Sequence, residues 1–166
     1  MRWEKEKNWR GVLQRNVSLY VYNAFLKEVL ARFKFRGDYI LAKAFSPAIQ
    51  KVLHRTPYDL LVPIPLSSER IAERGFNQAK ALADEASLQT TEVLTRIHTE
   101  KQSKKKRFER IHDVQIFHVS EQAKVDGKVI LLIDDIYTTG ATLHQAAKAL
   151  KDAGAKTVTS FTLARG

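Results

Sequence analysis

Cysteine is absent from this sequence of 166 residues, and long hydrophobic runs are absent as well. The lack of thiols excludes disulfides and thiolate metal sites, so no zinc is expected. The longest apolar run is far shorter than the ~18 residues that a membrane-spanning helix needs. No signal-peptide pattern opens the chain. These absences predict a cytoplasmic protein with no membrane span.

Two further scarcities limit the function. The five histidines are dispersed along the chain and lack the spacing of metal ligands. Acidic residues number 18 against 28 lysines and arginines, which leaves a formal net charge of +10. Because a cationic protein attracts polyanions, the charge favours phosphorylated ligands or nucleic acid as partners. The length fits one domain.

The most informative stretch covers residues 127–142 and reads GKVILLIDDIYTTGAT. Its apolar run, residues 129–133, predicts a strand that is buried on both faces, as in a parallel sheet. We expect Asp134 and Asp135 at the carboxyl end of that strand. A short loop follows, and an apolar-periodic helix of about a dozen residues is predicted to open at Ala141 and Thr142.

This arrangement suits a sugar phosphate. Backbone N–H groups at a helix start bind anions, and Gly140 allows the backbone to approach a ligand closely. The threonine hydroxyls can add donors. Asp134 and Asp135 can accept hydrogen bonds from sugar hydroxyls or hold a hydrated Mg²⁺. The alternative is a buried strand and a capped helix with no ligand. A P-loop ATPase is excluded, because the sequence has no Gly-x-x-x-x-Gly-Lys-Ser/Thr.

The same stretch resembles the phosphoribosyl pyrophosphate (PRPP) motif of type I phosphoribosyltransferases, with every position of the motif filled. The resemblance implies an α/β fold with a mostly parallel open sheet, helices on both faces and an N-terminal helical cap. It also implies that Asp134 and Asp135 contact the ribose hydroxyls and that the loop binds the 5′-phosphate. That loop comprises Thr138, Thr139, Gly140, Ala141 and Thr142.

A second candidate site follows a predicted strand over residues 60–64. Ser67 is expected to cap a short helical turn, and Asn77 to cap a helix that runs to about Ala86. In type I phosphoribosyltransferases the loop after the first core strand takes the pyrophosphate, which the resemblance assigns here to Ser67, Arg70 and Arg74. Arginine forks and hydroxyls suit such an anion. A plain helical surface with ordinary ion pairs is the alternative.

Several segments narrow the resemblance to the ComF family, which includes a competence protein needed for DNA uptake during natural transformation. They are residues 33–38 (FKFRGD), 62–67 (VPIPLS), 73–79 (ERGFNQA), 100–104 (EKQSK) and 161–165 (FTLAR). The similarity spans about residues 20–166. Members of this family usually begin with a small cysteine-rich zinc finger, which this sequence lacks. The resemblance implies single-stranded DNA and proteins of the uptake machinery as partners.

A basic run carries half of the formal net charge. It contains Glu109 and six cationic residues: Lys101, Lys104, Lys105, Lys106, Arg107 and Arg110. Its position corresponds to the loop that closes over PRPP in the transferases, so Lys104 and Arg107 are candidates for a catalytic role. Equally, the run can bind single-stranded DNA through its cations, supported by Arg32, Lys34 and Arg36. A solvated loop remains the third interpretation.

The predicted architecture has a lead-in over residues 1–18, a helical cap over 19–56 and a core over 57–166. A helix is expected from Ser18, and a second helix from Asp38 that is broken or restarted at Ser46–Pro47. Strands are expected over 60–64, 93–96, 114–119 and 156–163, with 60–64 and 93–96 in the parallel sheet. The strand–helix–strand unit after residue 127 should be a right-handed crossover.

The predicted function is that of a ComF competence protein in DNA uptake that binds PRPP or a related ribose phosphate with Mg²⁺, together with single-stranded DNA. The alternative is a metabolic phosphoribosyltransferase, which joins a nitrogen acceptor to PRPP and releases pyrophosphate.

Overall fold

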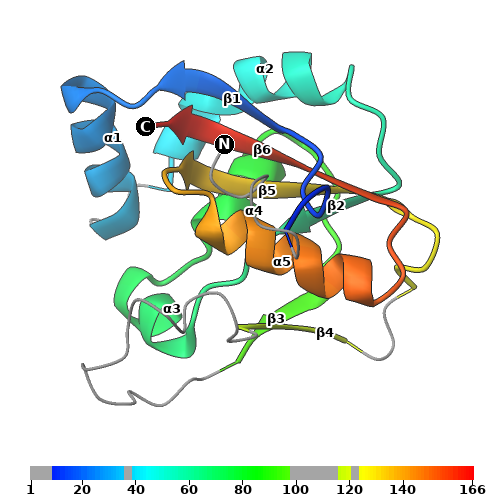
Figure 1. The fold of residues 1–166 in the computed structure, drawn as a ribbon. Helices are drawn as coiled ribbons and strands as arrows, with labels where there is room; N and C mark the ends of the chain where they lie inside the picture. Colours follow the sequence, from blue (N-terminus) through cyan, green and yellow to red (C-terminus); the bar gives the residue numbers. More distant parts are fainter. Residues whose placement is uncertain (1–8, 36–38, 98–115, 121–123) are drawn as a thin grey trace.

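The computed structural model describes residues 9–35, 39–97, 116–120 and 124–166 (Figure 1). The elements of this part of the chain, in order, are β1 (Asn16–Val21), α1 (Ala24–Phe35), α2 (Leu41–Leu53), β2 (Leu60–Pro63), α3 (Ser68–Arg74), α4 (Gln78–Glu85), β3 (Leu94–Arg96), β4 (Phe117–Val119), β5 (Val129–Tyr137), α5 (Ala141–Asp152) and β6 (Thr157–Arg165). The predicted α/β class, with a parallel sheet and helices, is confirmed.

The main sheet has the strand order β1-β6-β5-β2, and its three pairings are parallel. β5 is central and extends further than β2, because β2 ends at Pro63 opposite Ile133 while β5 stays paired with β6 as far as Tyr137. Asp134 and Asp135 lie within β5 near its carboxyl end, because the strand continues past the apolar run to Tyr137. Both acids lie beyond the end of β2, which opens space beside them.

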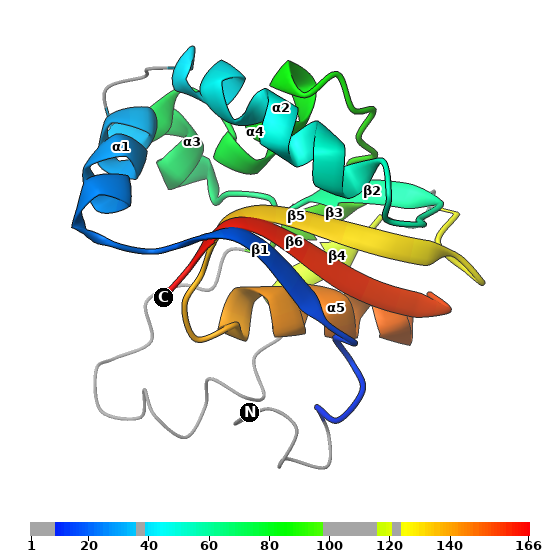
Figure 2. The same ribbon diagram turned by 90° about the horizontal axis from the view of Figure 1, so that it is seen from above.

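The sheet is covered on both faces (Figure 2). Helices α1, α2, α3 and α4 lie on one side, and α5 lies on the other. Side chains from α1, α2 and α4 pack with one face of the sheet around Phe33, Ile49 and Phe161, while α5 packs on the opposite face around Leu132 and Leu150. Burial of each such side chain stabilises the fold by about 1.5–3 kcal/mol.

The N-terminal segment differs from the prediction. The helix expected from Ser18 begins only at Ala24, and residues 18–21 belong to strand β1, which pairs with β6. The true start of α1 is set by Asn23, whose Oδ1 accepts a hydrogen bond from the Leu26 N–H at 2.9 Å. The apolar pattern begins several residues before this cap. The boundary predicted between residues 18 and 19 thus falls inside a strand. Trp9, in the predicted lead-in, is buried.

Helix α2 runs through Pro47, where a break was expected. Proline removes one helical hydrogen bond, but burial of the face formed by Ala42, Ile49 and Leu53 offsets that loss. Two side chains also bond α2 to the end of α4: Ser46 Oγ donates to the Glu85 carbonyl at 2.8 Å and Gln50 Nε2 to the Ala86 carbonyl at 2.9 Å. Helix α2, which belongs to the predicted cap, therefore packs as part of the core.

Residues 93–96 were expected in the parallel sheet, which is wrong. β3 pairs instead with β4 in a separate antiparallel sheet of two strands. Leu94 and Phe117 are buried in the apolar cluster that includes α5. A strand of three residues has too short a pattern to predict which strand it pairs with. Packing against α5 decides where β3 lies.

Candidate functional site

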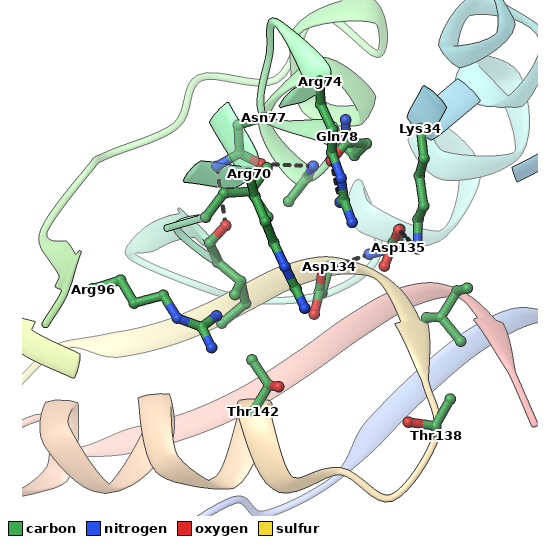
Figure 3. A pocket seen from close by; sticks show the side chains of 14 residues that line it. Lys34, Arg70, Arg74, Asn77, Gln78, Arg96, Asp134, Asp135, Thr138 and Thr142 are labelled. Carbon is green, nitrogen blue, oxygen red and sulfur yellow. Dashed lines mark hydrogen bonds and ion pairs between the residues drawn. The ribbon is translucent and has the colours of Figure 1, made fainter. Parts of the chain in front are cut away.

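A cavity of about 270 Å³ lies at the carboxyl end of β2 and β5 (Figure 3). Acidic, cationic and hydroxyl side chains from α1, α3, β3, β5 and α5 surround it. Its lining residues are Lys34, Ile64, Leu66, Arg70, Arg74, Asn77, Gln78, Ala79, Arg96, Asp134, Asp135, Ile136, Thr138 and Thr142. The structure thus brings together the acid pair, the arginines after β2 and part of the loop before α5.

The acid pair is held by the end of β5. Asp134 Oδ1 accepts a hydrogen bond from the Asp135 backbone N–H at 2.8 Å. Burial and the neighbouring Asp135 charge raise the pKa of Asp134 to about 8, although Lys34 acts in the opposite direction. The buried site thus favours the protonated form of Asp134 more than water does. Its carboxyl group can then donate as well as accept a hydrogen bond to a sugar hydroxyl.

Lys34 reaches the acid pair from the last turn of α1. Its ammonium group forms an ion pair with Asp135, and the two side chains are only 18% and 12% exposed. Lys34 had been grouped with surface cations that support DNA binding. The structure places it inside the cavity instead (Figure 3). The sequence pattern could not show this, because the partner lies about a hundred residues further along the chain.

Three guanidinium groups also line the cavity. Arg70 and Arg74 belong to α3, and Arg74 Nη1 donates to Gln78 Oε1 at 2.8 Å. Arg96 comes from β3, and sequence reasoning missed it as a site residue. Burial and the nearby Arg70 charge lower the pKa of Arg96. Arg70 and Arg96 repel one another, so an anion bound between their guanidinium groups would be stabilised by both.

The loop before α5 depends on its glycine. Gly140 has φ +78°, in the left-handed region, and a Cβ at this position would collide with the Tyr137 ring. The His144 Nδ1–H donates to the Gly140 carbonyl at 2.9 Å, which fixes the first turn of α5. Thr139 Oγ1 accepts from the Ala141 N–H at 3.3 Å. Among the loop residues, the side chains of Thr138 and Thr142 are the ones that line the cavity.

The other predicted site residues have different positions. The Ser67 hydroxyl caps α3, as expected, by accepting a hydrogen bond from the Arg70 N–H at 3.4 Å, and Ser67 is not among the cavity-lining residues. The run Lys101 to Arg110, proposed for DNA binding, lies outside the described residues. So do the catalytic candidates Lys104 and Arg107.

The acid pair alone does not fit a protein-held metal ion. Among the described residues, no group of three or more His, Cys, Asp or Glu side chains comes close enough together to hold one. The cavity offers two carboxylates, and one of them is paired with Lys34. Magnesium prefers six oxygen ligands. A magnesium ion in this cavity would therefore need the oxygens of the ligand.

Comparisons with known proteins identify the family. The family model "Phosphoribosyl transferase domain" matches residues 71–166. Competence protein ComFC of Bacillus subtilis is 48% identical over 158 residues, which cover 93% of this chain and 65% of that protein. ComFC of Streptococcus pneumoniae is 38% identical over 163 residues, covering 98% of this chain and 72% of the relative. The chain belongs to the ComF family.

The ComF chain also has distant structural neighbours. A purine phosphoribosyltransferase from Pyrococcus horikoshii shares 12% identity, with 91% of this chain and 87% of that chain covered, at a TM-score of 0.45. The family assignment does not depend on this likeness. The chain spans only about two thirds of the length of the ComFC proteins. Within the part that the structure describes, no helix is both long and apolar enough to cross a bilayer.

Proposed function

We propose that this ComF protein binds PRPP or a related ribose phosphate in the cavity and acts, like the ComFC proteins, in DNA uptake. The observation that carries the proposal is that two sets of side chains line one cavity: the guanidinium groups of Arg70, Arg74 and Arg96, and the acids of β5. PRPP has a pyrophosphate group for the first set and ribose hydroxyls for the second. The volume of about 270 Å³ is slightly below the ~300–1,000 Å³ typical of ligand pockets.

The placement of a ligand follows from the charges. The 5′-phosphate would bind the N–H groups at the start of α5 with the hydroxyls of Thr138 and Thr142. Asp134 and Asp135 would bind the ribose hydroxyls. A pyrophosphate group would face Arg70 and Arg96. Magnesium would arrive as the chelate of PRPP, held by oxygens of the ligand, since the protein alone lacks a full ligand set.

Calorimetric titration with magnesium-PRPP tests this proposal. The wild type should bind, and the Asp134→Ala, Asp135→Ala double variant should lose binding. A matched control removes two surface acids, Asp84 and Glu92, which pair with Lys80 at 3.5 Å each. Equal and weak binding by all three proteins would contradict the proposal.

A metabolic phosphoribosyltransferase is the second candidate, and the three arginines are the observation in its favour. In that reaction a nitrogen nucleophile forms a bond to the anomeric carbon, the bond to the pyrophosphate oxygen breaks, and the nucleophile loses a proton. Cations facing the leaving group would stabilise its developing charge. Pyrophosphate release with any member of a panel of purines, pyrimidines and amines would favour this function; no release would favour the competence role.

Single-stranded DNA is the proposed second partner, with the run Lys101 to Arg110 as its main binding segment. Removal of one cation that binds a phosphate of the single strand should lower the log–log salt slope by roughly 0.7. Replacement of Lys104, Lys105, Lys106 and Arg107 by alanine should therefore reduce the slope by up to about 2.8. Base sequence should matter little. An unchanged slope would move the DNA site elsewhere on the protein.

A further inference from the structure

The cation at the acid pair is part of the chain itself. Lys34 contacts Asp135 within the cavity, and both side chains are largely shielded from water. The Asp135 carboxylate needs a counterion there, because an unpaired charge in such a place is strongly unfavourable. Buried charges are paired with an opposite charge or coordinate a metal ion. Among the described residues, no third carboxylate, histidine or cysteine joins these two acids to hold such an ion.

We propose that Lys34 takes the place of a metal ion at the acid pair, so that the sugar end of a ribose phosphate binds without magnesium. A carboxylate oxygen has more than one lone pair, so Asp135 can keep its ion pair and still accept a hydrogen bond from a ribose hydroxyl. Lys34 thereby acts as a positioning residue that holds Asp135 charged and oriented.

The consequence is a difference between two ligand classes. This inference rests on the proposed binding of ribose phosphates. PRPP chelates magnesium through its pyrophosphate. Its binding to the protein should therefore depend on magnesium, because the ligand itself carries the ion. Ribose 5-phosphate has no pyrophosphate to chelate the ion. Its binding should depend on the protein's own cations, Lys34 among them.

The position of Lys34 makes the test specific. Lys34 lies in the last turn of α1, while Lys27, on the same helix, is exposed to solvent. Lys34→Met keeps the length and apolar stem of the side chain and removes the charge. Lys34→Arg keeps the charge. Lys27→Met is the matched control, because it removes one charge from the same helix outside the cavity.

Ribose 5-phosphate binding should be measured by calorimetry in magnesium chloride and in EDTA, with circular dichroism to check folding. The wild type, Lys27→Met and Lys34→Arg should bind equally well in both conditions. Lys34→Met should bind about tenfold more weakly in EDTA, and magnesium should restore its affinity. Loss of wild-type binding in EDTA would overturn the inference. So would a Lys34→Met variant whose affinity in EDTA equals that of the wild type.

A second measurement separates this inference from the proposed function. If the wild type fails to bind ribose 5-phosphate even with magnesium, the ribose phosphate proposal fails. Binding of Mn²⁺ to the ligand-free protein, followed by electron paramagnetic resonance, then decides the role of Lys34. Lys34→Met should bind Mn²⁺ at least about tenfold more tightly than the wild type, and added Asp135→Asn should abolish that gain. Equal Mn²⁺ affinity of wild type and Lys34→Met would overturn the inference.

Discussion

The two sides of the cavity are built in different ways. The acidic side comes from one continuous segment, in which β5, the loop and α5 supply Asp134, Asp135, Thr138 and Thr142. The cationic side, formed by Arg70, Arg74 and Arg96, is assembled from α3 and β3, which are separated in sequence. The continuous side needs only β5, α5 and the loop between them to fold. The assembled side requires the packing of the whole domain.

This difference predicts how each side responds to mutation. Substitutions in the continuous segment should affect ligand binding and local stability directly. Substitutions among the three arginines should leave the fold intact and change mainly the affinity for a pyrophosphate group. The following experiments test this division, from the largest expected effect to the smallest.

Removal of both acids should cause the largest loss. The Asp134→Ala, Asp135→Ala variant removes hydrogen bonds to the ribose hydroxyls, and bonds to charged groups contribute about 1.5–3 kcal/mol each. The affinity for magnesium-PRPP should therefore fall by about a hundredfold or more, measured by calorimetry. A loss equal to that of the Asp84→Ala, Glu92→Ala control would show that the acidic side does not contact the ligand.

Gly140→Ala should destabilise the loop. The left-handed backbone costs a non-glycine residue about 1–2 kcal/mol, and the new Cβ would also collide with Tyr137. We expect a total loss of about 3 kcal/mol in the free energy of unfolding, measured with urea.

Gly127→Ala is the matched control for that variant. Gly127 has φ +69°, and an added Cβ there has no atom within 4 Å. Its substitution should lower the free energy of unfolding by about 1 kcal/mol, which is the cost of the left-handed backbone alone. Equal losses for Gly127→Ala and Gly140→Ala would mean that the proximity of Tyr137 does not shape the loop.

Arg96→Gln tests the cationic side. Loss of one charged interaction should weaken binding of inorganic pyrophosphate by about tenfold while the urea midpoint stays the same. Arg55→Gln is the control, because Arg55 is exposed and does not line the cavity. If Arg96→Gln binds pyrophosphate like the wild type, Arg96 lies outside the anion site.

The pH dependence of stability is a separate test, which concerns the protonation state of Asp134. The pKa of Asp134 is about 8 in the folded protein against 3.8 as its ordinary value, so the folded state binds more protons between these pH values. The contribution of Asp134 to stability is therefore complete below about pH 4 and is lost as the pH rises to about 8.

The comparison with Asp134→Asn isolates this contribution. The free energy of unfolding of the wild type, relative to that of Asp134→Asn, should fall steadily across the window from about pH 4 to about pH 8. A difference that stays constant with pH, or that grows, would show that Asp134 is ionised in the folded protein at neutral pH.

The continuous side of the site was predictable because its signals are local. The apolar run of β5, the glycine and the periodicity of α5 stand next to one another in the chain, and Ser67 and Asn77 cap the helices that were expected to follow them. Arg70 and Arg74 could be placed for the same reason, since their helix directly follows β2. These predictions needed only the order of residues along the chain.

The remaining parts could not be read in this way. Arg96 is the last residue of a short strand whose partner, β4, lies beyond residues 98–115, so its direction depends on a pairing that no local pattern encodes. Lys34 resembles any other cation on a helical surface until α1 is packed beside β5. The strand β1 was mistaken for a helix because pairing with β6 overrides its weak helical spacing.

The sequence by itself determined the class of the fold, the acid pair, the loop before α5 and the caps of α3 and α4, because each depends on residues a few positions apart. Tertiary structure alone decided that Lys34 and Arg96 enter the cavity, that β1 completes the sheet and that β3 stands apart from it. The physical reason is that charge pairing and strand pairing act between neighbours in space. Such neighbours exist only once the core has packed.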